Sequence, residues 1–359
     1  MRIYLDDAGS APILPEVAES LAVVPDGNPS SPHTEGRAAR AALDRARDVA
    51  AAALGAQRTE VTFTSSGTEA VNLALFGVAG PLVTWAAEHQ SVLAATRRMQ
   101  ALGRKTTIAG VDGVGRVDVD AIERGTALVS VGLANNEVGS VQPVEAVIQR
   151  AHDVGALVHV DACAGPRWIP IPAGADLVSF SGHKVGGGRG GLLFVRDGVR
   201  IDPLLFGGPQ EWGRRAGHED VMAAVAVATA LAVCARERRQ RSLTAASQSQ
   251  LLRATLEELG GTLTGADDRL PNFASCAFSG RRGEDMLLAL DLAGVAASSG
   301  SACASGSLDP SHVLLAMGLD LEQALGSLRL TVGYATTDAE VSRAGETLRT
   351  VLTRASVRA

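Results

Sequence analysis

The sequence predicts an α/β protein with a largely parallel sheet and a second, smaller α+β domain. Short apolar segments rich in β-branched residues alternate with alanine-rich stretches over the first two thirds of the chain, at residues 60–66, 81–88, 126–137, 156–162, 175–182 and 190–196. This repetition of strand and helix is typical of a parallel sheet covered by helices. The 359 residues also exceed the usual size of a single core, which favours two domains.

Helical segments connect these apolar stretches. Residues 37–55 and 143–155 have apolar positions at helical spacing, and each ends on a glycine, the residue that most often closes a helix C-terminus. The longest apolar run, residues 221–235, is shorter than the roughly 20 residues that span a bilayer and ends at charged residues. We therefore expect a buried helix there and no membrane-spanning segment.

The pattern changes from about Arg236. A charged helix is followed by a strand-like segment at 272–280, a helix at 283–294 and another strand-like segment at 327–333. We expect residues 15–235 to form the large domain, and residues 1–14 and 236–359 to form the small one.

Charge and cysteine content exclude several classes of function. The net charge is -6 and basic residues form no block, so neither nucleic acid nor an anionic membrane is expected as a direct partner. The amino terminus lacks the pattern of a secretory signal. The four cysteines lack the spacing of a zinc site or a disulfide framework. We expect a cytoplasmic protein without a metal centre, in which a cysteine matters through its reactivity.

Two charged residues follow predicted strands. Lys184, flanked by serine, histidine and glycine, stands where partial desolvation makes an amine a nucleophile for Schiff-base formation. Asp161 ends a buried strand 23 residues earlier, and a buried carboxylate needs a cationic partner such as a protonated pyridine nitrogen. Each residue alone also fits a structural role, as a solvated lysine or a helix cap. Ligands of parallel sheets bind at the carboxyl ends of the strands, so both residues are expected at one cavity.

Further polar positions also follow strands. Residues 64–72 open a helix with small residues, so the backbone at Gly67 and Thr68 would contact a phosphate, although Ser-Gly-Thr also forms an ordinary N-cap. His89 would stack on a planar cofactor or transfer a proton, or serve the structure alone. Asn136 has an amide suited to a ring hydroxyl. Together with the lysine and the aspartate, these positions are explained by one cofactor, pyridoxal 5'-phosphate (PLP).

The chain as a whole resembles the cysteine desulfurases of the NifS and IscS type, within the fold type I, class V aminotransferase superfamily. The resemblance extends through TSSGTEAVNLAL, AEHQSVL, NNEVGSVQP, HVDA, SFSGHK, GGPQEWGRRAG and SSGSACASGSLDPSHVLLAMG. It implies a large domain with a mostly parallel seven-stranded sheet, a small α+β domain that carries a cysteine loop, PLP as cofactor, and a homodimer.

The resemblance also assigns roles around the cofactor ring. It implies that Lys184 forms the Schiff base and that Asp161 pairs with the ring nitrogen. His89 would stack on the ring, and Asn136 would lie near the ring hydroxyl and the substrate. These are the residue types that hold the ring and adjust its electronic properties in such enzymes.

The phosphate and the substrate carboxylate receive further residues by the same resemblance. Thr68, Ser181 and His183 would join the phosphate site beside Gly67. Arg329 would clamp the carboxylate of the substrate, a bidentate task that suits a guanidinium group.

Cys303 is implied as the nucleophile and persulfide carrier. In the implied reaction L-cysteine becomes L-alanine, because Lys184 removes the α-proton and the Cys303 thiolate attacks the substrate sulfur. The small residues at 297–310 would let the loop move between cofactor and acceptor. The acceptor stays open among iron–sulfur assembly, tRNA or DNA thiolation, and a biosynthetic pathway.

The chain departs from the family pattern at three places. Ala164 stands where a glutamine usually contacts the ring hydroxyl, and residues 186–191 read GGGRGG where the family has YGPKG. His218 stands where a threonine usually reaches the phosphate of the neighbouring subunit, so we expect it among the cofactor-binding residues. These changes suggest a specialised member of the family.

Other functions stay open at this point. A selenocysteine lyase, an aminotransferase or an epimerase of the same superfamily would share the PLP site, but the cysteine loop argues against most of them. A non-catalytic sulfur-transfer scaffold would retain the fold, and the presence of Lys184 and Asp161 counts against it.

Overall fold

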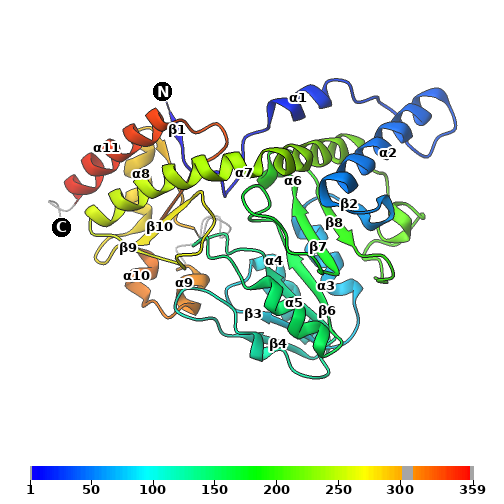
Figure 1. Ribbon diagram of the computed structural model, residues 1–359, viewed down its shortest axis with the longest axis horizontal. Coiled ribbons are helices and arrows are strands. Elements are labelled where there is room, and N and C mark those ends of the chain that lie inside the picture. The colour runs from blue at the N-terminus through cyan, green and yellow to red at the C-terminus, as the bar shows by residue number, and fades with distance from the viewer. Residues whose placement is uncertain (1, 301–309, 356–359) are drawn as a thin grey trace.

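A seven-stranded sheet forms the centre of the computed structural model, which describes residues 2–300 and 310–355 (Figure 1). The strand order is β2-β8-β7-β6-β5-β3-β4, and only β8 runs antiparallel to its neighbours within this sheet. The strands are β2 (Val61–Thr64), β3 (Leu82–Trp85), β4 (Thr106–Ala109), β5 (Leu128–Gly132), β6 (Leu157–Asp161), β7 (Leu177–Ser181) and β8 (Gly191–Val195). The predicted mostly parallel sheet is therefore confirmed.

Helices cover both faces of this sheet, since its strands bury side chains on both sides. In β3, for example, Val83 and Trp85 belong to one apolar core and Leu82 to another. The first core includes residues of α1 (Pro15–Leu21), α2 (Thr34–Leu54), α5 (Val144–Asp153) and the first part of α7. The second includes residues of α3 (Gly67–Gly77) and α4 (Gln90–Ala101). The sheet thus lies between two helical layers, and the ends of its strands are left for a site.

The remaining elements form a smaller body around short strands. In one sheet β10 (Phe273–Ala277) lies antiparallel between β9 (Thr262–Leu263) and β12 (Ser327–Thr331). The amino-terminal β1 (Ile3–Tyr4) pairs in parallel with β11 (Val295–Ala296). The helices here are α8 (Gly283–Leu292), α9 (His312–Ala316), α10 (Leu321–Leu325) and α11 (Asp338–Ala355). The amino-terminal residues therefore pack with the carboxyl-terminal third of the chain.

A single helix of 38 residues, α7 (Val221–Glu258), runs from the large sheet into the smaller body (Figure 1). Its first part, up to Cys234, packs in the core of the large sheet, and its second part, from Ala245, packs with β10 and β12. The sequence pattern predicted a change of element near Arg236, and the helix instead continues through that charged stretch. We propose that the domain boundary falls within α7. Among the described residues, no helix is long and apolar enough to cross a membrane.

Candidate active site

A cavity of about 420 Å³ opens beside the carboxyl ends of the parallel strands. It brings together most of the residues that the sequence singled out, namely Gly67, Thr68, His89, Asn136, Asp161, Ser181, His183, Lys184 and Arg329. They come from segments far apart in the chain, and Arg329 comes from the small body. The cavity therefore lies where the two bodies meet.

Asp161 and Lys184 reach the cavity from neighbouring strands. Asp161 is the last residue of β6, and Lys184 stands in the four-residue helix α6 (Gly182–Val185) directly after β7. The helix stops at Gly186, whose φ of +85° is a left-handed conformation that glycine adopts without strain. The short helix thus fixes the backbone position from which the Lys184 side chain extends.

The carboxylate of Asp161 is held by neighbours that favour its charged form. The Ser179 hydroxyl and the Cys163 backbone N–H both donate to Oδ1, each at 3.0 Å. Burial raises the pKa of Asp161, but the nearby His159 and the donors from Cys163 outweigh it and hold that pKa below its usual value. A fully buried anion in such surroundings suits a cationic ring nitrogen.

His159 supports this carboxylate from inside the sheet. Its Nε2 lies 3.2 Å from the Ser179 hydroxyl and its Nδ1 lies 2.9 Å from the Ser130 hydroxyl. Burial lowers the pKa of His159 to about 4, so this imidazole is neutral at ordinary pH and is charged only at the low pH where Asp161 itself titrates. Ser179 therefore links a neutral histidine to the charged Asp161.

The amino-terminal end of α3 forms one end of the cavity. Ser66 caps the helix by accepting the Glu69 N–H, and Gly67 and Thr68 begin its first turn. A Cβ on Gly67 would come within 2.6 Å of Cys163 Sγ and 2.8 Å of Ser181 Cβ, so this close packing requires glycine. The first N–H groups of a helix have no intrahelical acceptor, and they favour an anion.

His183 and Ser181 stand at the same end of the cavity. The Ser181 hydroxyl lies 2.9 Å from His183 Nδ1. Burial, with the nearby Lys184 and His89, lowers the pKa of His183. Both side chains offer hydrogen bonds to an anion beside the start of α3.

His89 forms the N-cap of α4 and lines the cavity. Its Nδ1 accepts the Ser91 N–H at 3.1 Å, so the neutral imidazole carries its proton on Nε2. Burial and the nearby Lys184 lower the pKa of His89. The ring is therefore neutral and fixed in orientation by the helix that it caps.

Glu88, which the sequence analysis did not single out, also lines the cavity. Its Oε1 accepts the Gly132 N–H at 3.0 Å. Burial, with the nearby Asp161, raises the pKa of Glu88 to about 8. The signal in the sequence was a charged residue directly before His89 at the end of an apolar strand.

Arg329 extends from β12 of the small body and is 3% exposed. Its Nη2 donates to Asp6 Oδ1 at 2.7 Å, and its Nη1 donates to the Asn136 carbonyl at 2.6 Å. The neighbouring Asn135 side chain accepts the backbone N–H groups of Glu137 and Val138 and so fixes the turn that presents Asn136. A cation and an amide thus lie together opposite the strand ends.

Cys303 lies outside the described residues, within 301–309. The residues on either side of that segment are described. Gly300 lines the cavity, and the Ser311 hydroxyl donates to the buried Glu137. The chain therefore leaves the described structure at the cavity wall and re-enters it beside residues that follow β5.

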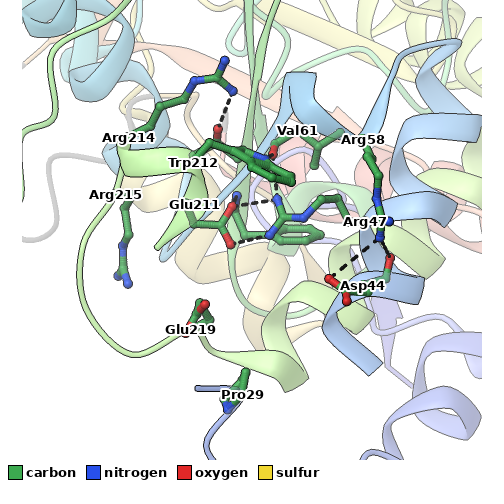
Figure 2. A network of polar contacts seen from close by, with 12 residues as sticks. Pro29, Asp44, Arg47, Arg58, Val61, Glu211, Trp212, Arg214, Arg215 and Glu219 are labelled. Carbon is green, nitrogen blue, oxygen red and sulfur yellow. Dashed lines mark hydrogen bonds and ion pairs between the residues drawn. The ribbon is translucent and has the colours of Figure 1, made fainter. Parts of the chain in front are cut away.

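His218 is exposed and is not among the residues that line the cavity. Its expected role concerns the phosphate of a neighbouring subunit, which a single chain does not test. Figure 2 shows how its segment is anchored: Glu211 faces Arg47 of α2, with bonds of 2.7 and 2.8 Å, and Trp212 lies alongside. The backbone is strained here, because Glu211 and Trp212 have φ angles of +47° and +63°.

The cavity also contains residues that replace family features. Ala164 lines it where the family has a glutamine, so no side-chain amide is offered from this position. Cys163, beside it, was not singled out because a cysteine after a strand reads as a small core residue. Burial and the nearby Asp161 raise the pKa of the Cys163 thiol, which keeps it protonated.

These residues fit PLP by their chemistry. An anion site at the start of α3, a buried carboxylate and a lysine line one cavity, and they match the phosphate, ring nitrogen and aldehyde of that cofactor. Among the described residues, no cluster of histidine, cysteine or acidic side chains could hold a metal ion.

The chain is similar to known proteins over nearly its whole length. The family model for aminotransferase class-V matches residues 3–344. A cysteine desulfurase of Trichormus azollae is 39% identical over 375 aligned positions, covering 98% of this chain and 93% of that protein. The structure of a NifS-like protein superposes with a TM-score of 0.91 at 31% identity, covering 98% of this chain and 100% of that one. A structure of SspA in complex with cysteine has a TM-score of 0.80 at 29% identity, with 94% and 100% covered. This chain belongs to the class-V aminotransferase family and, within it, to the cysteine desulfurases.

Proposed function

We propose that this protein is a PLP-dependent cysteine desulfurase that converts L-cysteine to L-alanine and receives the sulfur on Cys303 as a persulfide. The observation that carries the proposal is that Lys184, Asp161 and Arg329 line the same cavity as Gly300. Cys303 is three residues beyond Gly300, so about 11 Å of extended chain separates them at most. The structural neighbour SspA was solved in complex with cysteine. The relatives do not favour the selenocysteine lyase, the other class V activities or the scaffold.

PLP is held, in this proposal, by residues from both ends of the cavity. Gly67, Thr68, Ser181 and His183 would bind its phosphate, and Asp161 would pair with its ring nitrogen. Bound there, PLP supplies an electron sink for the charge left when the α-proton of an amino acid departs.

The chain's own side chains position the substrate and move its protons. Arg329 binds the substrate carboxylate through N–H groups along one edge of its planar guanidinium, and Asn136 borders the same position. Lys184 would hold the cofactor and, as a free amine, would accept the α-proton on Nζ. His89 would keep its proton on Nε2 and would contact the ring.

Cys303 completes the reaction with a balanced exchange of bonds. Its thiolate forms a bond to the substrate sulfur while the bond between that sulfur and the substrate Cβ breaks. Cβ gains a proton and Cα regains the proton that Lys184 had accepted, which gives alanine, and the sulfur stays on Cys303 as a persulfide. The persulfide then transfers sulfur to an acceptor.

Three further properties belong to the same proposal. The protein works as a homodimer in which His218 contacts the phosphate of the neighbouring subunit, and it works in the cytoplasm. The acceptor is a protein or small molecule of iron–sulfur assembly, tRNA or DNA thiolation, or a biosynthetic pathway. The composition, with four cysteines and a net charge of -6, supports a reducing compartment and no nucleic-acid surface.

A thiol-matched assay tests the activity. Purified protein with PLP is given L-cysteine, and alanine and persulfide are measured for the wild type, Cys303→Ala and Cys163→Ala. Cys303→Ala is expected to retain cofactor and lose persulfide, whereas Cys163→Ala is expected to retain both. No alanine from the wild type would refute the desulfurase, and persulfide that depends on Cys163 would show that Cys303 is the wrong thiol.

A further inference from the structure

A second, much smaller cavity of about 20 Å³ adjoins Lys184. Its walls come from both bodies of the protein: Cys163, Ala164 and Arg167 follow β6, while Asp7 and Asn272 pack in the small body. The Lys184 side chain lines this cavity as well as the main one.

Two buried polar atoms of this wall have no hydrogen-bond partner among the described residues. They are Arg167 Nε, a donor, and Asn272 Oδ1, an acceptor. Arg167 is 2% exposed and Asn272 is 1% exposed, so bulk water does not reach them. Buried polar groups without partners are rare and costly, because they lose their hydration and gain nothing in return.

Both side chains are fixed by their other contacts. Arg167 Nη1 donates to both carboxylate oxygens of Asp7, at 2.8 and 2.7 Å, and its guanidinium packs on the Tyr334 ring at 4.1 Å. Asn272 Nδ2 donates to the Val332 carbonyl at 3.3 Å. Neither group is therefore free to turn toward another partner within the protein.

The size and polarity of the cavity suit one water molecule. A water needs about 10–15 Å³ of this kind of volume and two to four polar partners. The cavity has about 20 Å³ and offers one orphan donor and one orphan acceptor beside a lysine.

We propose that one buried water occupies this cavity, accepts the Arg167 Nε–H, donates to Asn272 Oδ1 and donates its second hydrogen to Lys184 Nζ. This arrangement requires a lone pair on Nζ, so the water stabilises the neutral amine of Lys184 once that amine is free. The neutral amine is the form that accepts the α-proton in the proposed function, and the inference rests on that function. Asn272 and Arg167 are then positioning residues that act on Lys184 through the water.

Other charged or titratable residues line the two cavities beside Lys184. Among the described residues, they are Asp6, Glu88, His89, Asp161, Cys163, His183 and Arg329 on the main cavity, and the Asp7–Arg167 pair on the small one. A change at Asn272 leaves all of these groups in place, so it isolates the effect of the water.

The test uses holoenzyme, with Asn272→Leu as the variant and Ser275→Ala as the matched control. Ser275 is also buried in the small body, three residues further on, but does not line the cavity. A crystal structure of the wild type is expected to show one water beside Lys184, within hydrogen-bonding distance of Asn272 Oδ1 and Arg167 Nε. The Asn272→Leu structure is expected to lack it.

Kinetics supply the second readout. In Asn272→Leu the acid limb of the pH profile of kcat should move to higher pH by about one unit, which corresponds to the loss of one hydrogen bond. The KM for cysteine should stay unchanged. Ser275→Ala should leave the profile where it is. A dry cavity in wild-type crystals, or equal pH profiles for the two variants, would overturn the inference.

The crystallographic measurement on the wild type does not depend on the folding of any variant. It also separates the two proposals, since a protein that holds this water but makes no alanine refutes the desulfurase and leaves the water site standing.

Discussion

The guanidinium of Arg329 is fixed between Asp6 and Asn136, with Nη2 at 2.7 Å from Asp6 Oδ1 and Nη1 at 2.6 Å from the Asn136 carbonyl. These residues come from the amino-terminal segment, the segment that follows β5, and β12. Three distant parts of the chain therefore orient one side chain. A guanidinium group that is already oriented loses little conformational entropy when it binds a carboxylate.

Arg329→Lys should raise KM for cysteine by about tenfold or more, because an ammonium group lacks the planar fork that binds a carboxylate bidentately while it contacts Asp6 and Asn136. Asp6→Asn keeps an Oδ1 acceptor in the same place and should change KM by less than about threefold. Steady-state kinetics on both variants check this. A larger effect from Asp6→Asn would show that the charge of Asp6, and not its geometry, governs the site.

Lys184→Ala should abolish the visible absorption of cofactor bound through a Schiff base. The sequence offers an unusually clean control, since Lys105 is its only other lysine and is exposed. Lys105→Ala should keep the full spectrum. After borohydride reduction, mass spectrometry should find the cofactor on the peptide with Lys184, and its recovery on Lys105 would contradict the assignment.

Gly67→Ala should weaken PLP binding by about tenfold to a hundredfold, the effect of overpacking by one methyl group. The added Cβ would lie 2.6 Å from Cys163 Sγ. Cys163→Ala in the same chain should restore part of the affinity by removing that sulfur. Titration of the apoprotein with PLP measures all three proteins, and equal affinities for wild type and Gly67→Ala would disprove the close packing.

Glu88 should make stability depend on pH. Its pKa rises from 4.5 in the unfolded chain to about 8 in the folded one, mainly through burial, so the folded state binds more protons between these values. Stability therefore falls as pH rises through this window, by at most about 1.4 kcal/mol per pH unit. Glu88→Gln, which keeps an acceptor for Gly132 N–H and does not titrate, should remove this slope.

Urea unfolding from pH 5 to pH 9 checks the Glu88 prediction. The exposed Glu123→Gln serves as the control and should follow the wild type at every pH. Parallel curves for the wild type and Glu88→Gln would mean that Glu88 is ionised in the folded protein throughout this range.

Arg47→Met should destabilise the protein by about 3–5 kcal/mol, because it leaves the buried Glu211 carboxylate without its cation. Arg58→Ala, in the short 3-10 helix that follows α2, changes a side chain that is 46% exposed and paired with Asp44 and Asp48, and should cost about 1 kcal/mol or less. Thermal unfolding of both variants gives the comparison. Similar losses of stability in the two variants would show that the ion pair between Arg47 and Glu211 is not what stabilises this region.

Much of the fold was predictable because the central strands are apolar on both faces. Every predicted strand of the large sheet is present, and α2 ends at Gly55, with a φ of +65°, where its C-cap was expected. The edge strand β4 (Thr106–Ala109) escaped prediction, since it is half exposed and carries little apolar pattern. The continuity of α7 escaped it as well, because composition changes near Arg236 without a glycine or proline to stop the helix.

The site was predictable where a residue type has one dominant use at a strand end. Lys184 and Asp161 line one cavity as their spacing suggested. Glu88 and Asp6 were missed because their significance depends on what burial and tertiary contacts place beside them. Cys163 gave no signal of its own, and the role of His218 depends on a second chain.

The parallel pair of β1 and β11 has a consequence for biosynthesis. Ile3 pairs with Val295, so the first strand waits for about 290 further residues to be synthesised before its partner exists. At ribosomal rates of about 5–20 residues per second, this delay lasts roughly 15–60 s. Ile3 and Leu5, which end buried, stay unpaired for that time, whereas the strands of the large sheet can assemble as they emerge. The nascent chain therefore exposes an apolar segment at Ile3 and Leu5, to which chaperones can bind until translation is nearly complete.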